Sequence, residues 1–302
     1  MMQLKKKCKV QASMSDKIFD FLNIALMLVI MVIFLYPLYF VVIASISDPY
    51  AVWNGEVLLW PIGITLDGYR EIMTFDTILT GYRNSILYTA GSIALGLVLT
   101  ISAAYPLSQP DFYMGGLFSK LLLFTMFFSG GLIPSYFIVK GLKLLNTPLA
   151  CIIPGAVSVT NIIITRTFIK SSIPREQREA AFLDGCSHFM YLIRIVLPLS
   201  KAILAVMALY YGVGQWNAYF NAMIYLTDAE LYPLQLVLRG ILLTTEATLE
   251  SGSDPETLMA QQRLGEVIKY GVIVVSALPA MIAYPFVQKN FVKGVMIGSL
   301  KG

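Results

Sequence analysis

The sequence has little charge, cysteine or histidine. Only 13% of its 302 residues are charged, where soluble domains carry about 25%, and its mean hydropathy is +0.71. One histidine, His188, and three scattered cysteines, Cys8, Cys151 and Cys186, are too few for a histidine metal cage or a disulfide framework. The net charge of +4 is too diluted for a nucleic-acid-binding face. A soluble globular enzyme is thereby excluded, and no metal site or nucleic-acid partner is expected.

Long apolar runs fill most of the chain instead. An ionised side chain at the bilayer centre costs at least about 2.5 kcal/mol, so charge-free runs of roughly 20 residues can cross the hydrocarbon as helices. Six runs of 19 to 27 residues qualify. They predict an all-α membrane protein with six transmembrane helices, at residues 21–47, 84–110, 121–139, 144–165, 202–227 and 270–288.

Lysine and arginine are distributed unevenly between the connecting segments. Fifteen of the 22 lie before the first run, in the second-to-third and fourth-to-fifth connections, and after the last run. Because positively charged loops stay in the cytoplasm, both termini are predicted to be cytoplasmic. The predicted organisation is a cytoplasmic segment at 1–20, a six-helix transmembrane domain at 21–290 and a cytoplasmic tail at 291–302.

Proline and glycine interrupt several of these runs, notably at Pro106, Pro134, Pro154 and the Gly130-Gly131 pair. Such residues kink a helix and free backbone groups that a neighbouring helix or a water-filled cavity must satisfy. The pattern favours a bundle that encloses a path. Ordinary packing of membrane helices is the alternative, since glycine and proline are common in them.

The fourth-to-fifth connection, residues 171–201, is the most informative stretch. Pro174 suits the first turn of a helix, and Gly185 can adopt the left-handed conformation that ends one. A second helix is then expected through Phe189, Tyr191 and Ile195 to Pro198. This pattern predicts a helix, a glycine bend and another helix at 172–196. From the residues alone, a solvated amphipathic connector is the alternative.

The spacing within this connection resembles a known signature. Glu179-Ala180-Ala181, Gly185, Ile195 and Leu197-Pro198 follow the pattern EAA, three residues, G, nine residues, I, one residue, LP. That pattern is the signature of binding-protein-dependent ABC importer permeases of the type I (MetI-like) fold, whose coupling helix docks on a cytoplasmic ATPase. The resemblance implies an ATPase contact formed by Glu179, Ala180, Ala181, Asp184 and Gly185, with Ile195, Leu197 and Pro198 completing the motif.

Other runs resemble carbohydrate importers, in particular the second permease subunit of maltose-type systems. They are YRNS at 82–85, Trp216-Asn217, and the tail FVKG at 291–294. FSGGLIP at 128–134 and LLNT at 144–147 are similar to the LplC/YtcP-like branch, which is associated with complex oligosaccharides. In maltose-type relatives the tail reaches the ATPase interface, so the resemblance makes Lys301 and Gly302 candidates for that contact. A frayed terminus is the alternative.

The same resemblance implies a set of partners and a place in the cell. The partners would be a second homologous permease, an ATPase dimer that binds ATP and Mg²⁺, and an extracytoplasmic solute-binding protein. The substrate would be a carbohydrate, and the location the bacterial cytoplasmic membrane. No cofactor is expected in this chain.

The sequence contains no P-loop motif, G-x-x-x-x-G-K-[ST], so the ATPase must be another chain. The six apolar cores also lack every titratable Asp, Glu, Lys, Arg or His, which argues against a proton-coupled carrier. Transport makes no covalent bond, and no catalytic residue is predicted. A permease for a non-sugar solute and a secondary carrier or channel remain the competing interpretations.

Neutral polar and aromatic side chains within the runs are candidates for a sugar path, because sugars bind through hydrogen bonds and aromatic faces. Most of them cluster in the fifth run. The alternative for each is an interhelical hydrogen bond that only holds the bundle together. The candidates are Tyr136, Asn161, Gln215, Trp216, Asn217, Tyr219 and Asn221.

Overall fold

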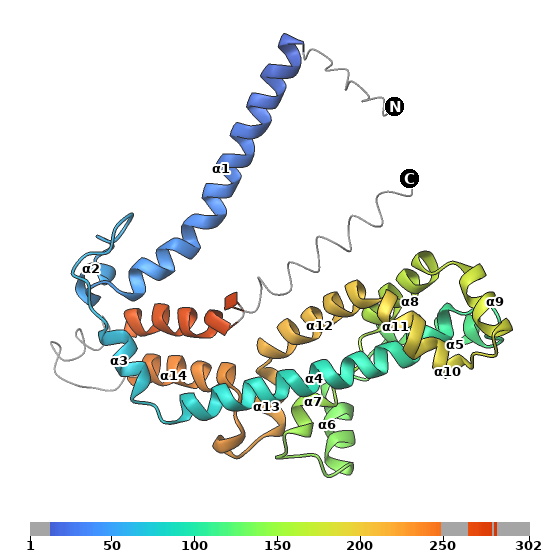
Figure 1. Cartoon of the computed structure of the whole chain (residues 1–302). Helices are drawn as coiled ribbons and strands as arrows, with labels where there is room; N and C mark the ends of the chain where they lie inside the picture. The colour runs from blue at the N-terminus through green and yellow to red at the C-terminus, as the bar shows by residue number, and fades with distance from the viewer. Residues whose placement is uncertain (1–12, 249–264, 280, 283–302) are drawn as a thin grey trace. The chain divides into compact units, whose positions relative to one another are not determined.

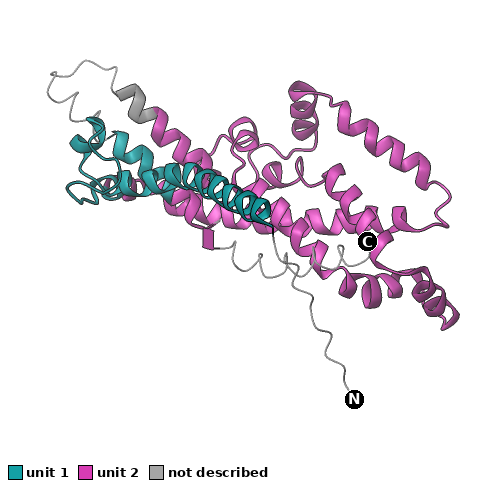
Figure 2. Cartoon of the chain, turned by 90° about the horizontal axis from the view of Figure 1, so that it is seen from above, with its two compact units in different colours: residues 1–70, 253–274 teal, residues 71–252, 275–302 magenta. Residues whose placement is uncertain are grey.

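The computed structural model describes residues 13–248, 265–279 and 281–282, and every regular element in those ranges is helical. The chain divides into two units, residues 1–70 with 253–274 and residues 71–252 with 275–302 (Figure 2). The predicted all-α class is confirmed. The tail at 291–302 and residues 249–264, between the fifth and sixth runs, lie outside the described residues.

The first unit contains α1 (Met14–Ser45) and α2 (Pro49–Trp53). With 32 residues, α1 is about 48 Å long, and it is buried only at its end, from Ile43 to Ser45. An apolar helix that the described residues of its own unit leave largely uncovered is suited to lipid. Its end is fixed by a 2.8 Å hydrogen bond between the hydroxyls of Ser45 and Tyr69. The helix α3 (Asp67–Met73) follows at the boundary between the two units.

The helix α4 (Thr77–Ser108) is the centre of the second unit and packs against α8 (Val159–Ser172), α12 (Lys201–Trp216) and α14 (Leu234–Thr248), as Figure 1 shows. One side of α4 carries small residues at intervals of four positions, or seven across Tyr88. Lipid is as apolar as the helix surfaces, so no hydrophobic force drives the helices together. Small residues allow close approach, and van der Waals packing then stabilises the contact. The buried small residues are Gly81, Ser85, Ser92, Gly96, Thr100 and Ala104.

Tyr211 shows how close this approach is. Its ring fills the space beside Gly96, where a Cβ atom would lie 2.8 Å from the ring. Its hydroxyl bonds to Thr100 Oγ1 at 2.7 Å and accepts the Ser158 backbone N–H at 3.3 Å. One side chain therefore joins α12 to α4 and to the start of α8.

Polar side chains in the first turns of α4 hold a distant segment through its backbone. Asn84 Nδ2 donates to the Glu230 and Tyr232 carbonyls at 2.7 and 3.1 Å, and Ser85 Oγ accepts the Leu234 N–H at 2.8 Å. Tyr88 donates to the Leu231 carbonyl at 2.9 Å. The YRNS run thus stabilises the turn η2 (Ala229–Leu231) and the start of α14.

Breaks interrupt three of the predicted spans. The third run is divided between α5 (Gly115–Phe127) and α6 (Leu132–Gly141), which are bent by 114° around Gly130 and Gly131. The fourth run, 144–165, gives no continuous helix: α7 (Leu149–Ile152) ends, and α8 starts only at Val159. Pro154 lacks the N–H that a helix would need there. The fifth run breaks between α12 and α13 (Phe220–Tyr225).

The count of six spans is not confirmed by the described helices. Within those residues, α1 and α4 alone are long and apolar enough to cross a bilayer as single helices. The α5–α6 pair and the pair formed by residues 188–199 with α12, which is bent by 81°, raise the number to four if each pair is one span. The sixth run, 270–288, is helical over the parts described, 270–279 and 281–282.

We predict that Gly96→Val destabilises the bundle. The new side chain must displace the Tyr211 ring, which its two hydrogen bonds hold in place, and overpacking of this kind costs about 1–3 kcal/mol. Thermal unfolding of the detergent-solubilised protein would measure the loss. Gly214→Ala, at a position with nothing within 4 Å of the new Cβ, is the control. Equal melting temperatures for wild type and Gly96→Val would contradict the prediction.

Candidate coupling site

The predicted helix, bend and second helix form as expected after α8. The first is α9 (Arg175–Leu183), preceded by Pro174, and the second begins as α10 (His188–Tyr191). It continues through the π-helical turn η1 (Leu192–Val196) and α11 (Leu197–Leu199). We call residues 174–191 the knob. In Figure 1 it lies beside the end of α4 and the start of α5.

Gly185 closes α9 with a defined backbone motif. Its φ is +77°, in the left-handed region where a residue with a Cβ atom is strained by about 1–2 kcal/mol. The Gly185 N–H donates to the Phe182 carbonyl and the Cys186 N–H to the Ala181 carbonyl, both at 3.0 Å. These are the two bonds of a Schellman cap. The glycine therefore turns the chain sharply into α10 while the last carbonyls of α9 stay satisfied.

A small apolar cluster fixes the knob to the bundle. It consists of Tyr105 from α4, Ile169 from α8, and Ala181, Tyr191 and Val196 from the knob and η1. Tyr191 is only 1% exposed. Tyr105 also donates its hydroxyl hydrogen to the His188 carbonyl at 3.2 Å. The end of α4 is thus connected to both helices of the knob.

Arg178 ties α9 to the connection between α4 and α5. Its guanidinium forms an ion pair with Asp111 and lies over the Phe182 ring at 5.0 Å. Phe182 in turn contacts the His188 ring edge-on at 4.8 Å. The side chain of His188 is otherwise exposed.

The outer face of the knob is exposed and partly apolar. Glu179, Ala180, Asp184 and Gly185 of the predicted contact lie on it, together with Leu183 at 89% and Phe189 at 71% exposure. Neither of these apolar residues is part of the predicted ATPase contact. The signal was available, since large apolar side chains stood beside the glycine bend in an otherwise polar connection.

The other residues of the signature lie elsewhere. Ala181 is buried in the apolar cluster, and its small side chain is used within the chain. Ile195 packs against the same cluster, Leu197 is half-buried, and Pro198 is exposed. Lys301 and Gly302 lie outside the described residues.

The candidate path residues do not form one group. Trp216 Nε1 donates to the Ser276 carbonyl at 3.0 Å, a bond to a distant segment that favours the packing alternative for this residue. Asn217 is exposed, and its Nδ2 donates to the Val213 carbonyl one turn earlier in α12 at 2.9 Å. Tyr136 stacks on Tyr225 at 6.2 Å between ring centroids.

The remaining candidates differ in their surroundings. Asn161 is buried in the first turn of α8, whereas Gln215 and Asn221 are half-buried. Tyr219 is exposed and lies under the guanidinium of Arg239 from α14, 4.7 Å from the ring centroid. Of the seven candidate path residues, Tyr219 combines an aromatic ring with a neighbouring cation.

The LLNT run at 144–147 also has a structural role. Asn146 has a positive φ of 57°, which asparagine tolerates better than most residues. Its backbone N–H donates to the Tyr225 carbonyl at 2.8 Å, and its side-chain oxygen accepts the N–H groups of Thr227 and Asp228 at 3.0 and 2.9 Å. It therefore joins the α6–α7 connection to the end of α13.

A chain of apolar, repeatedly broken helices with a polar helix–turn–helix knob defines a membrane transport subunit. No family model matches the chain. It is 37% identical to the protein LplC of Bacillus subtilis over 288 residues, 95% of this chain and 96% of LplC. It is 35% identical to the polygalacturonan/rhamnogalacturonan transport system permease protein YtcP of the same organism, over 96% of this chain and all of YtcP.

A solved structure agrees with these relatives. A chain of a bacterial ABC transporter involved in the import of the acidic polysaccharide alginate matches with a TM-score of 0.81 and 32% identity, over 92% of this chain and 98% of that one. The chain belongs to the family of carbohydrate ABC importer permeases that includes LplC and YtcP.

We predict that Arg178→Gln loosens α9 from the bundle. The change removes the ion pair with Asp111 and the contact over Phe182, together worth about 1 kcal/mol, so amide hydrogen exchange in α9 should become about fivefold faster. Glu176→Gln, an exposed position on the same helix, is the matched control. Unchanged exchange in Arg178→Gln would show that the pair does not hold the helix.

Proposed function

We propose that this chain is one of two permease subunits in an ATP-driven importer for oligosaccharides, and that the knob is where an ATPase subunit docks. The observation that carries the proposal is the knob itself. It presents Glu179, Ala180 and Gly185 on an exposed face while its inner face is fixed to α4.

The anchoring suits a part that transmits force. A docked ATPase that pushes on the outer face would act through Ala181 and Tyr191 on Tyr105, and so on α4. Because α4 also packs against α8, α12 and α14, a displacement of the knob reaches most of the second unit. Packed elements with discrete arrangements carry coupling of this kind. Closure of the ATPase dimer would then drive alternating access.

The remaining assembly follows from the family. A second permease would complete the path, a solute-binding protein would deliver the sugar on the outside, and ATP with Mg²⁺ would bind the ATPase. The fifteen basic residues on one set of connections support a cytoplasmic location for the knob and both termini. The permease would reside in the bacterial cytoplasmic membrane. The seven candidate path residues stay candidates, of which Tyr219 has the best support.

We predict that Glu179→Ala and Gly185→Asp each uncouple ATP hydrolysis from transport. The first removes an exposed carboxylate that could pair with a basic group of the ATPase, and the second strains a left-handed residue and displaces α10. In proteoliposomes with all partners, binding-protein-stimulated ATPase activity should fall by about tenfold. Glu176→Ala on the same helix is the control.

Two further results would overturn the proposal. Normal uptake by both variants would exclude a coupling role for the knob. Uptake driven by an ion gradient without the ATPase would indicate a secondary carrier instead. Membrane insertion, followed by the yield of detergent-extracted protein, should be the same for all three variants.

The imported sugar is proposed to be an oligosaccharide derived from an acidic polysaccharide. YtcP is named for polygalacturonan and rhamnogalacturonan, and the structural neighbour for alginate. In this chain, Arg239 beside the Tyr219 ring pairs a cation with an aromatic face. Such a pair suits a uronic acid, whose ring can stack while its carboxylate accepts hydrogen bonds from the guanidinium.

We predict that Arg239→Gln selectively impairs uptake of acidic oligosaccharides. Loss of one charge-assisted hydrogen bond should reduce uptake of an oligogalacturonate by about tenfold, while any uptake of a neutral oligosaccharide of the same length stays constant. Competition assays in whole vesicles would measure both. Arg83→Gln, which removes another cation from a predicted outer connection, is the control. An equal decrease for both sugars would exclude a role in recognising the carboxylate.

A further inference from the structure

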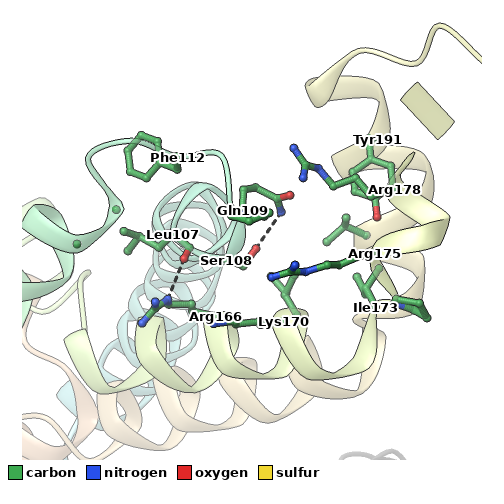
Figure 3. A pocket seen from close by; sticks show the side chains of 16 residues that line it. Leu107, Ser108, Gln109, Phe112, Arg166, Lys170, Ile173, Arg175, Arg178 and Tyr191 are labelled. Carbon is green, nitrogen blue, oxygen red and sulfur yellow. Dashed lines mark hydrogen bonds between the residues drawn. The ribbon is translucent and has the colours of Figure 1, made fainter. Parts of the chain in front are cut away.

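A cationic pocket lies between the knob and the bundle, next to a groove where Arg175 and Arg178 border Glu179 and Leu183. Its cavity of about 250 Å³ is bounded by the end of α4, the start of α5, the end of α8 and the start of α9 (Figure 3). Four basic side chains line it, and no acidic side chain does. They are Arg166, Lys170, Arg175 and Arg178.

Three of these four cations have no ion-pair partner in the part of the chain that the structure describes. Among the residues that the structure describes, no carboxylate lies within ion-pair distance of Arg166, Lys170 or Arg175. Arg178 is paired with Asp111, which does not line the pocket, and its Nε is buried without a hydrogen-bond partner in the described part of the chain. Its side chain is only 13% exposed. A guanidinium that is largely desolvated and borders the cavity raises the positive potential there and favours an anion in the cavity.

The neutral lining adds hydrogen-bonding groups. Figure 3 shows Arg175 extending toward the end of α4, where Ser108 and Gln109 lie. Arg166 Nε is already used, since it donates to the Leu107 carbonyl at 2.8 Å, which orients the guanidinium at the pocket. Rigidly held arginines beside a lysine are suited to a phosphate, whose oxygens accept several such bonds.

The position of the pocket identifies the source of the phosphate. It lies at the end of α4, a helix apolar and long enough to cross a bilayer, and therefore at the level of lipid headgroups. Phe112, Gly115 and Gly116 continue the lining onto α5, where Leu117 and Leu121 are more than half exposed. A lipid with its phosphate in the pocket could run its acyl chains along this face. Basic pockets between membrane helices hold anionic headgroups in this way.

We propose that this pocket binds the phosphate of an anionic phospholipid and thereby fixes the start of α9 to the ends of α4 and α8. The occupant lies between the bundle and the helix that carries Glu179. The coupling helix would then rest on a protein–lipid contact as well as on the apolar cluster.

The test is phospholipid binding to the full chain, purified in detergent with its partner permease. Native mass spectrometry would compare phosphatidylglycerol with phosphatidylcholine for wild type, for Lys170→Gln/Arg175→Gln, and for Arg194→Gln/Lys201→Gln. The last pair removes the same charge from exposed positions outside the pocket. We expect the pocket variant to bind phosphatidylglycerol about tenfold more weakly, the control variant to bind it like wild type, and phosphatidylcholine binding to be weak throughout.

Two outcomes would overturn the proposal. An equal loss in both double variants would mean that general surface charge attracts the lipid. The second outcome is that millimolar inorganic phosphate displaces phosphatidylglycerol and that the pocket variant, unlike wild type, fails to retain phosphate. This result would assign the pocket to a soluble anion instead of a lipid. Both double variants leave the anchoring contacts of Tyr105 and Ala181 intact, so both are expected to fold. Size-exclusion chromatography checks that they do.

Discussion

Close approach between α4 and its neighbours is the constraint on which the second unit depends. Inside a bilayer, apolar surfaces gain nothing from facing each other, so helices associate where small residues let backbones and rings come together. Gly96 creates the space for Tyr211, and the Tyr211 hydroxyl then bonds to Thr100 and to the first residue before α8. The position of α8 sets where α9 begins, and with it the orientation of the knob.

The knob itself separates two tasks by face. Ala181 and Tyr191 point inward and hold it to the bundle, whereas Glu179 and Gly185 remain on the exposed side. The EAA signature therefore mixes docking residues with anchoring residues. A substitution at Ala181 acts first on the apolar cluster, and one at Glu179 acts on the surface.

The sequence was sufficient for the helical class, the glycine bend and the family, because each depends on local patterning. The charge-free run 84–110 predicts most of α4. The helix nevertheless begins earlier, at Thr77, and includes Arg83. A single charge near a helix end can reach the membrane surface, so it does not end the span.

The breaks and the path were harder to predict. Gly130 and Pro154 marked places where a helix could stop, but the 114° bend between α5 and α6 depends on tertiary contacts that no local pattern encodes. The same is true of the candidate path residues. Nothing in the residue types distinguishes Trp216, which bonds to the Ser276 carbonyl, from Tyr219, which faces a guanidinium. The sequence shows Leu183 and Phe189 as apolar residues beside the bend but not that they are exposed, because exposure depends on which face of each helix packs on the bundle.

The bond from Tyr105 to the backbone of residue 188 has an evolutionary consequence. The acceptor is a main-chain carbonyl, which every amino acid possesses. The side chain at position 188 can therefore diverge between homologues without loss of this link, while position 105 must keep a hydroxyl at the end of a long side chain. A permease could adapt the rim of its knob to a different ATPase through residue 188 and retain the same connection to α4.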